Sequence, residues 1–351
     1  MVAVKKIETV VRVFFVKTEL ERLVADLIAA AYKDGSKCYL FAYRENLLQS
    51  FLWNKWAGKR FLNLKQKRGV LSSQRTALTH LIDIESVIKN QCNTAKRIEI
   101  YLSRLKNSNS NYSIRFLSDL FPLADVRVNI IPHGASDFFR GRPSQREIKK
   151  MKAKNNWIVR LLYPRLKYYA FENDPYDSDD SVVKSIYTFP GHNLGHKKSK
   201  RIDTYMLDSE YLGSDSKSDD ILVVGQPVYM KERLTPEIVK KIDYRIIQLI
   251  KHVGGGKVYY LPHPREDGSM CFFQKGFELL KAEESLELLL LKRKFRIVIS
   301  SFSTGLFTSK IILGNQCTPY AVGLNLVNLP ANDLKKIRGG FEAAGVKLVD
   351  L

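Results

Sequence analysis

The amino-acid sequence predicts an α/β fold of two Rossmann-like domains that face each other across a cleft. At 351 residues the chain is too long for one ordinary core, and its length suits two α/β domains. Short apolar runs alternate with amphipathic stretches, which is the pattern of βα units. Polar, turn-rich sequence near the middle separates two such series. We therefore expect a first domain in residues 1–180, a connection in residues 181–219 and a second domain in residues 220–351.

The first series begins with a predicted strand at Arg12–Lys17, a helix at Glu19–Tyr32 and a strand at Lys37–Ala42. The helix has one apolar face with the i, i+3, i+4, i+7 spacing, formed by Leu20, Leu23, Val24, Leu27 and Ile28. Two further strands, each preceded by a helix, are predicted at Arg97–Leu102 and Val126–Ile131. The basic stretch from Pro143 to Ala170 is predicted to be helical with a break at Pro164, because proline interrupts a helix.

The connection is marked by the acidic segment Glu172–Ser181 and the glycine-containing polar segment Gly191–Arg201. The strands predicted after it are Ile221–Gly225, Lys257–Leu261, Arg296–Ser300 and Pro319–Gly323. The helices predicted between them lie near Pro236–His252, Phe272–Lys292 and Thr304–Leu313. Ligands of open parallel sheets bind beyond the carboxyl ends of the strands, so the residues directly after these strands are the first functional candidates.

The charge balance is strongly basic. The chain has 57 Lys and Arg residues against 36 Asp and Glu residues, a formal net charge of +21. Such a surface attracts nucleic acid, anionic lipid headgroups or an anionic substrate. No zinc finger, KH loop or RNP motif occurs, which argues against nucleic acid as a partner. A solvated surface explains any single basic cluster, but together the clusters predict contact with the inner membrane surface or an acidic polymer. The clusters are Lys59–Arg60, Lys65–Arg68, Arg146–Lys154, Lys197–Arg201 and Lys292–Lys294.

The cysteines and the apolar runs predict a cytoplasmic protein. The cysteines lie far apart and form no CxxC pair, which favours reduced thiols; they are Cys38, Cys92, Cys271 and Cys317. No run of eighteen apolar residues occurs, and the N-terminal sequence lacks the shape of a signal peptide. We expect a cytoplasmic location, with peripheral binding to the inner face of the membrane through the basic clusters.

Neither a metal nor another cofactor is expected. His192 and His196 have the i, i+4 spacing of metal ligands on a helix, but they lie in the predicted connection without a third ligand nearby. The tryptophans Trp53, Trp56 and Trp157 have basic neighbours and can in principle touch a membrane interface. Packing of these rings in the core is the preferred interpretation.

One strand of the second series ends in a histidine between two prolines. The strand Lys257–Leu261 runs into Pro262, His263 and Pro264. Proline on both sides restricts the local backbone and presents the imidazole rigidly. A histidine beside a leaving phosphate can donate a hydrogen bond to it or protonate it, because the histidine pKa lies near working pH. The alternative is a turn that happens to contain a histidine.

A second strand end is rich in hydroxyl groups. The strand Arg296–Ser300 runs into a turn that opens a helix, and the hydroxyl side chains there are Ser300, Ser301, Ser303 and Thr304. With the backbone N–H groups at the helix start they would form a phosphate cradle, although simple capping by Ser303 or Thr304 explains part of the pattern. A third strand ends in Gly225 and Gln226, and a glutamine there can bind a base or a sugar.

This ordered set of strand ends resembles the bacterial sialyltransferase and polysialyltransferase superfamily, in which one strand ends in His-Pro and a later one in Ser-Ser. The string Tyr260–Glu266, YLPHPRE, is most similar to the lipooligosaccharide sialyltransferases of glycosyltransferase family 52. Further matches are Ile221–Pro227 and the segment Lys17–Leu20 after the first strand. The resemblance covers the second half of the chain well and the first half by layout alone.

The resemblance implies a GT-B fold and a CMP-activated sugar as the donor. His263 would contact the phosphate of CMP and assist its departure, while Ser300 and Ser301 would hold the same phosphate. An acidic residue would bind ribose or cytosine, for which Glu284 and Glu287 are candidates, with solvated helical carboxylates as an equal alternative. The residues expected to bind the donor are Gly225, Gln226, His263, Pro264, Arg265, Glu284, Glu287, Ser300, Ser301, Ser303 and Thr304.

The family also has an Asp/Glu-Asp/Glu-Gly motif after a strand of the first domain, which supplies the base for the acceptor hydroxyl. This sequence departs from that motif. Glu266–Gly268 has the right letters but directly follows His-Pro in the second domain, so we interpret it as a coincidence. The positional equivalent is Pro132–Gly134, after the strand Val126–Ile131. We predict that His133 is the base, with Asp137 as its orienting residue or substitute; a purely structural histidine is the alternative.

Together these features predict an inverting, metal-independent glycosyltransferase. It would move sialic acid or a related nonulosonic acid from its CMP donor to a hydroxyl of a cell-surface glycan. Stereochemistry and metal independence follow from the resemblance. The acceptor would be a lipid-linked or polyanionic glycan of lipooligosaccharide, capsule or O-antigen. One alternative is a GT-B glycosyltransferase that uses another nucleotide sugar, and another is a non-catalytic protein that binds polyanions or nucleic acid.

Overall fold

The structure is a computed structural model in which the described residues form two compact units. The first unit contains the described residues up to His133 and those between 144 and 201, and the second contains those from 218 onward. The described residues are 9–49, 53–63, 70–92, 94–106, 108–133, 144–153, 157–171, 181–188, 199–201, 218–226, 235–263, 276–280 and 285–350.

The first unit is built on a parallel sheet with the strand order β3-β2-β1-β4-β5-β6-β7. Its strands are β1 (Val10–Val16), β2 (Lys37–Ala42), β3 (Gly58–Phe61), β4 (Arg97–Leu102), β5 (Asp125–Ile130), β6 (Val183–Thr188) and β7 (Ser199–Arg201). Every residue of β1 is buried, as expected for a central strand covered on both faces. β6 and β7 lie within the segment assigned to the connection from the sequence, so part of that segment completes the first sheet.

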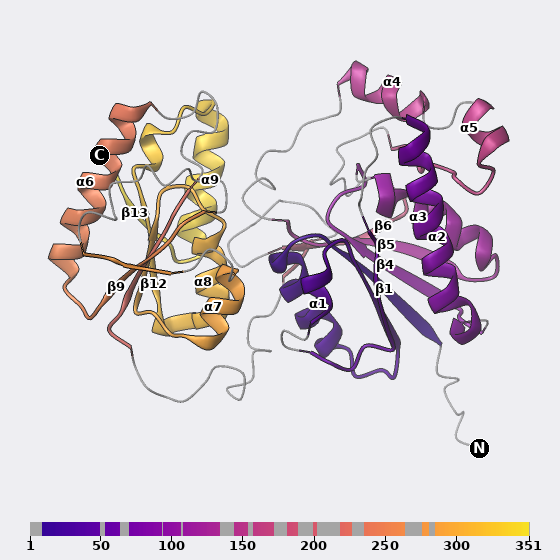
Figure 1. Ribbon diagram of the computed structural model, residues 1–351, viewed down its shortest axis with the longest axis horizontal. Helices are drawn as coiled ribbons and strands as arrows, with labels where there is room; N and C mark the ends of the chain where they lie inside the picture. The colour runs from indigo at the N-terminus through magenta and orange to yellow at the C-terminus, as the bar shows by residue number, and fades with distance from the viewer. Residues whose placement is uncertain are drawn as a thin grey trace. The chain divides into compact units, whose positions relative to one another are not determined.

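Helices cover both faces of the first sheet. α1 (Glu19–Ala31) lies on one face, and α2 (Val70–Cys92) and α3 (Ser108–Leu120) lie on the other (Figure 1). α1 begins after Thr18, whose hydroxyl accepts a hydrogen bond from the N–H of Glu21 at 3.2 Å. The α2 and α3 face carries a large hydrophobic core cluster, which includes Val13, Phe41, Leu81, Ile100 and Leu117.

The basic stretch of the first unit forms two shorter helices, α4 (Gln145–Ala153) and α5 (Trp157–Leu162). α5 ends before Pro164, so the predicted break is confirmed. The interpretation of Trp157 as a core residue is wrong, because its side chain is 73% exposed on α5. Trp56 is buried, by contrast, and its indole N–H donates to Asp26 of α1 at 3.2 Å. In the part of the chain that the structure describes, no helix has the length and apolar character needed to cross a membrane.

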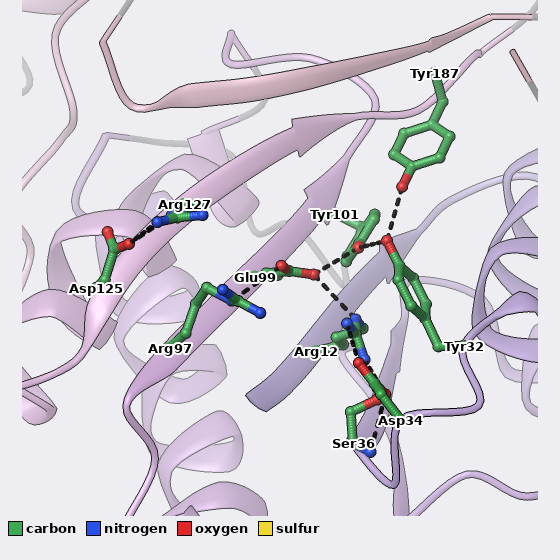
Figure 2. Close-up of polar contacts among 10 residues, drawn as sticks. All are labelled: Arg12, Tyr32, Asp34, Ser36, Arg97, Glu99, Tyr101, Asp125, Arg127 and Tyr187. Carbon is green, nitrogen blue, oxygen red and sulfur yellow. Dashed lines mark hydrogen bonds and ion pairs between the residues drawn. The ribbon is translucent and has the colours of Figure 1, made fainter. Parts of the chain in front are cut away.

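The α1 face of the first sheet contains a charged network centred on Arg12 of β1 (Figure 2). Its guanidinium donates to both carboxylate oxygens of Asp34, at 2.9 and 2.8 Å, and to Glu99 of β4, at 2.9 Å. Arg12 is only 2% exposed, and burial alone would lower its pKa. The two carboxylates outweigh burial and raise the pKa of Arg12, while the Arg12 hydrogen bond holds the pKa of Asp34 well below its usual range.

A chain of tyrosine hydroxyls extends this network across the sheet (Figure 2). Tyr101 of β4 donates to Glu99 at 2.9 Å. The hydroxyl of Tyr32, directly after α1, lies 3.0 Å from that of Tyr101 and 2.9 Å from that of Tyr187 on β6. The network therefore joins the end of α1 to three strands, and it satisfies polar groups that are costly to bury unpaired.

The second unit has a parallel sheet with the order β10-β9-β8-β11-β12-β13. Its strands are β8 (Ile221–Val224), β9 (Val258–Leu261), β10 (Glu278–Leu279), β11 (Ile297–Ser300), β12 (Thr318–Val322) and β13 (Lys347–Val349). α6 (Pro236–Val253) covers one face and packs Ile242 and Ile246 into the core. α7 (Leu286–Lys292), α8 (Gly305–Leu313) and α9 (Ala331–Ala343) lie on the other face (Figure 1).

The predicted α/β fold with two parallel sheets is confirmed, and every strand predicted from the sequence agrees with the structure to within two residues at each end. The predicted helix Phe272–Lys292 is too long: its end at Lys292 is confirmed, but its earlier part is contradicted. β10 occupies Glu278–Leu279 inside that range, and α7 begins only at Leu286. Gly276, just before β10, has a left-handed φ of 78°, which a right-handed helix does not contain.

Candidate functional site

The carboxyl ends of β1, β4 and β5 meet at one edge of the first sheet, because β4 pairs in parallel with both other strands. β1 leads through Lys17 into α1, β4 ends before Ser103, and β5 runs on to His133. Beyond β5 the N–H of Ile131 still bonds to the carbonyl of Leu102, at 3.0 Å. This bond fixes the direction in which the chain delivers His133 to the edge.

Glu21, in the first turn of α1, is a buried carboxylate at this edge, with 1% of its side chain exposed. Its Oε1 contacts Nδ1 of His133 in an ion-pair geometry. Its Oε2 accepts a hydrogen bond from the backbone N–H of Lys17, and the hydroxyl of Ser103 donates to the same carboxylate. Residues from three neighbouring strand ends therefore converge on one carboxylate.

These contacts determine the ionisation of the cluster. Burial alone would raise the pKa of Glu21, but the hydrogen bonds from His133, Ser103 and Lys17 outweigh it and lower that pKa below its usual value. Glu21 is thus ionised at neutral pH despite its burial. The pKa of the Lys17 ammonium is lowered, chiefly by burial and further by the charge of Arg104, although Glu21 opposes the shift.

The arrangement selects one tautomer of His133. The Nδ1–H donates to the ionised Glu21, so Nε2 is the basic nitrogen of the neutral imidazole. His133 is 28% exposed, which leaves part of the ring accessible, whereas Glu21 is closed off from solvent. A buried carboxylate that orients a histidine and stabilises its protonated form is the arrangement of a general base.

The structure places His133 directly beyond β5, where the sequence predicted a base. Asp137, predicted as its orienting residue or substitute, lies outside the described residues. Sequence reasoning missed Glu21. Its signal was the spacing Thr18-x-x-Glu21 after a strand, which also fits an ordinary helix cap. Only the fold brings Glu21 to a histidine 112 positions away.

In the second unit the ends of β9, β8 and β11 lie side by side, because β8 pairs in parallel with both neighbours. The register pairs Val224 with Leu261 on one side and Val223 with Ile299 on the other. Continued beyond the strands, this register would bring Gln226 next to His263 and Ser301 next to Gly225. β9 and β11 are two strand spacings apart, about 10 Å, which leaves room for a phosphate between side chains that extend from them.

Ser300 connects two of these strand ends. Its buried hydroxyl donates to the carbonyl of Val224 at 2.9 Å and accepts a hydrogen bond from Nε2 of Gln226 at 3.3 Å. Both hydrogen-bonding roles of the hydroxyl are thereby used within the protein. Ser300 therefore positions Gln226, and it is not the residue best placed to bind a ligand.

Ser301 differs from Ser300 in this respect. Its Oγ is buried, and none of the described residues forms a hydrogen bond with it. Ser303, two residues on, accepts a hydrogen bond from the N–H of Gly305 at 3.0 Å where α8 begins. A buried hydroxyl beside a helix N-terminus suits a bound anion, because the hydroxyl and the helix dipole both favour negative charge.

The starts of α7 and α8 are packed against each other. A Cβ at Gly305 would lie 2.4 Å from Leu286 of α7, so glycine permits this close approach. Glu287, a predicted donor-binding residue, follows Leu286 in the first turn of α7. Thr304 precedes α8 but makes no side-chain cap there. Predicted donor-binding residues outside the described residues are Pro264, Arg265 and Glu284.

His263 follows β9 by two residues, as predicted, and is partly buried. The predicted residues described in this unit therefore divide between three adjacent strand ends and the start of α7. The histidines His192 and His196, considered above as metal ligands, lie outside the described residues. Among the residues that the structure does describe, no group of three His, Cys, Asp or Glu side chains is arranged to hold a metal ion.

Comparison with solved structures identifies similar folds. The α/β-galactoside α-2,3-sialyltransferase of Photobacterium phosphoreum has a TM-score of 0.51 and 12% identity, over 97% of this chain and 98% of that one. A sialyltransferase of Photobacterium damsela has a TM-score of 0.51 and 10% identity, over 97% and 81%. The UDP-GlcNAc 2-epimerase of Methanocaldococcus jannaschii has a TM-score of 0.52 and 10% identity, over 95% and 92%. These similarities confirm the predicted GT-B-type fold.

A search of curated protein sequences finds no significant match. The family model of the alpha-2,8-polysialyltransferases, in contrast, matches residues 52–320, which is more than half of the chain. This match includes the ends of β5, β8, β9 and β11, and with them His133, His263 and Ser300. The predicted resemblance to the sialyltransferases and polysialyltransferases is confirmed: the chain belongs to the alpha-2,8-polysialyltransferase family and is a glycosyltransferase.

Proposed function

We propose that the protein is an inverting, metal-independent transferase that moves sialic acid or a related nonulosonic acid from its CMP donor to a glycan hydroxyl. The observation that carries the proposal is the contact between the buried carboxylate of Glu21 and Nδ1 of His133. A glycosyltransferase needs a base for the acceptor hydroxyl, and this pair supplies one in a family in which glycosyl transfer is the shared activity.

In the proposed reaction Nε2 of His133 takes the proton of the acceptor hydroxyl while its oxygen attacks the anomeric carbon. The new carbon–oxygen bond forms as the bond to the CMP phosphate breaks, and both electrons of that bond leave with CMP. Glu21 stabilises the imidazolium that results, because a buried carboxylate next to a cation is strongly favourable. Asp137 remains the competing candidate for the base.

The departing phosphate would be held in the second unit. Ser301 supports this role through its buried hydroxyl, which none of the described residues engages. We propose that His263 donates a hydrogen bond or a proton to the phosphate, that Gly225 and Gln226 bind the nucleoside, and that Glu287 binds ribose or cytosine. Negative charge that develops on the phosphate would be stabilised by the N-terminus of α8.

The acceptor proposed here is an anionic glycan of a cell surface, such as capsule, lipooligosaccharide or O-antigen. The formal net charge of +21 supports a polyanionic acceptor, because a basic surface concentrates a chain of carboxylates. The description of the matching family, alpha-2,8-polysialyltransferase, supports an acceptor that already carries sialic acid. A lipid-linked acceptor would place the enzyme at the inner face of the cytoplasmic membrane.

A thermal-shift comparison of nucleotides tests the donor. CMP is expected to raise the melting temperature in proportion to the logarithm of its concentration, because it binds the folded protein alone. UDP is the matched control. Protection by UDP without protection by CMP would establish the alternative of another nucleotide sugar. No effect of either nucleotide would contradict the proposed CMP donor.

A transfer assay with a His263→Ala variant tests the donor site directly. The variant should keep its fold, because His263 follows β9 and is no part of its buried core. Its turnover should fall strongly. Near-full transfer by a folded His263→Ala variant would remove His263 from the proposed mechanism.

A further inference from the structure

α5 of the first unit exposes almost all of its apolar side chains. The helix runs from Trp157 to Leu162 with the sequence WIVRLL. The exposed fractions are 73% for Trp157, 45% for Ile158, 72% for Leu161 and 54% for Leu162. Single exposed apolar residues are common on soluble proteins, but four within six positions form a patch that needs an explanation.

The helical geometry puts these four side chains on one side of α5. Trp157 and Leu161 are four residues apart, as are Ile158 and Leu162, so each pair is adjacent on the helix surface. Val159 points elsewhere and anchors the helix to the unit, with only 6% of its surface exposed. The apolar side chains of α5 are therefore divided into one inward anchor and an outward face.

Exposed basic residues lie on α5 and on α4, the helix that precedes it. Arg160 is exposed on α5 itself. α4 lies against the hydrophobic core through Met151 and presents Arg146, Lys149 and Lys150 to solvent. Only three residues separate α4 from α5, so the two helices lie within about 15 Å of each other along the chain. Residues 144–167 contain eight basic residues and one acidic residue, a net charge of +7.

We propose that α4 and α5, the α4–α5 surface, bind an anionic membrane. The apolar face of α5 enters the boundary between headgroups and acyl chains, where Trp157 is well suited because its ring is both apolar and a hydrogen-bond donor. The basic residues of α4 and Arg160 contact the anionic headgroups. The position of α4 and α5 within the first unit can be followed in Figure 1.

The combination of positive charge and exposed apolar area favours an anionic membrane over other partners of the α4–α5 surface. A soluble polyanion would neutralise the basic residues but leave the outward face of α5 in water. A second copy of the chain would cover the apolar face but bring two strongly basic surfaces together, which repel each other. An anionic bilayer satisfies both properties at once. The inference extends the proposed function, which places the enzyme at a membrane, by naming the surface that makes the contact.

Vesicle binding tests the proposal without any substrate. The full chain is incubated with phosphatidylcholine vesicles that contain or lack phosphatidylglycerol, and bound protein is measured by co-sedimentation. Binding should require phosphatidylglycerol and weaken with salt. The double variant Trp157→Ser/Leu161→Ser should bind about tenfold or more weakly, because it removes two of the largest inserted side chains. The matched control is Tyr244→Ser/Leu279→Ser, which removes two exposed apolar residues of the second unit and should bind like the wild type.

Tryptophan fluorescence provides a second measurement of the same event. The emission maximum of Trp157 should shift to shorter wavelength when the protein binds vesicles, whereas the emission of the buried Trp56 should not shift. Wild-type protein that ignores anionic vesicles, or a double variant that binds them as tightly as wild type, would overturn the proposal. Self-association that the double variant abolishes would instead assign the surface to a second copy. Transfer to a soluble acceptor tests the proposed function separately. If the wild-type protein transfers no sugar to such an acceptor but still binds anionic vesicles, the proposed function is refuted and the membrane-binding surface is not.

Discussion

The carboxylate of Glu21 forms a hydrogen bond with Nδ1 of His133, although 112 positions separate the two residues in the sequence. Glu21 is contributed by the first turn of α1 and His133 by the chain beyond β5. Neither residue is part of a motif in which the other could be found. The pair exists because β1 and β5 flank β4 in the sheet and their carboxyl ends open to the same edge.

Replacement of the base gives the first prediction. His133→Ala should lower turnover by about 100- to 10,000-fold, the usual contribution of a general base, and leave the affinity for CMP nearly unchanged. Steady-state transfer rates and CMP binding by calorimetry measure the two effects. Weakened CMP binding in this variant would point to a role on the donor side.

Asp137→Asn is the parallel variant, because Asp137 is the alternative base. It should retain most of its activity if His133 is the base. Loss of activity in Asp137→Asn, together with normal activity in His133→Ala, would reverse the assignment.

The second prediction concerns Glu21, which acts through His133 and is therefore a positioning residue. Glu21→Gln keeps the shape of the side chain but removes its charge, so the imidazolium formed during transfer loses its stabilising partner. Turnover should fall on the order of 100-fold. The loss should appear in kcat and leave the affinity for CMP nearly unchanged, because the imidazolium forms only during the transfer step.

Glu19→Gln is the matched control for this variant. Glu19 lies in the same helical turn, but its carboxylate pairs with Arg44 and accepts a hydrogen bond from Asn46 instead. Glu19→Gln should leave kcat unchanged. An equal loss of activity in both variants would show that Glu21 has only a structural role.

The third prediction separates two neighbouring serines. Ser301→Ala should weaken CMP binding by about tenfold to 100-fold, which corresponds to a hydrogen bond to a charged group of about 1.5–3 kcal/mol. It should not lower stability, because no described residue bonds to this hydroxyl. Ser300→Ala should instead cost about 1 kcal/mol of stability, because Ser300 bonds to both Val224 and Gln226.

Chemical denaturation and CMP titration of the two variants measure these effects together. We expect Ser301→Ala to lose CMP affinity but not stability, and Ser300→Ala to lose stability but not CMP affinity. Normal CMP affinity in the Ser301→Ala variant would rule out the phosphate cradle at this turn.

The fold could be predicted in most of its parts because alternation of apolar and amphipathic segments is a local property of the sequence. The strands that precede His133, His263 and Ser300 were located correctly. The apolar pattern did not predict the structure correctly where the conformation of individual backbone residues determines whether a helix or a strand forms. Nothing in the apolar spacing of residues 272–292 indicates that Gly276 adopts a left-handed conformation and that β10 follows it.

The site could be predicted only in the residues that directly follow strands. Glu21 was not among them, because a glutamate three residues into a helix usually remains in water and its burial depends on β4 and β5. The interpretation of Trp157 as a core residue was wrong because this side chain is exposed where burial was expected. A tryptophan is buried in most proteins, and its exposure on α5 depends on which side of that short helix the core covers.

The last prediction concerns acid stability and the network around Arg12. The Arg12 hydrogen bonds lower the pKa of Asp34, and a carboxyl with a lowered folded-state pKa stabilises the protein above its ordinary pKa. That contribution is present at neutral pH and is lost as the pH falls below about 4. Asp34→Asn removes the charge, so at pH 7 it should lower the unfolding free energy by about 1 kcal/mol. This is less than the usual value for a hydrogen bond to a charged group, because the Asp34 side chain is 44% exposed and solvent screens its charge.

The difference between wild type and Asp34→Asn should then shrink as the pH falls from 5 towards 2, because acid protonates Asp34 in the wild type. Urea unfolding at a series of pH values measures this. Asp83→Asn is a suitable control, because Asp83 pairs with the half-exposed Arg60 on the surface and such pairs contribute little. A stability difference for Asp34→Asn that stayed constant down to pH 2 would show that the loss comes from packing around Arg12 and not from the charge of Asp34.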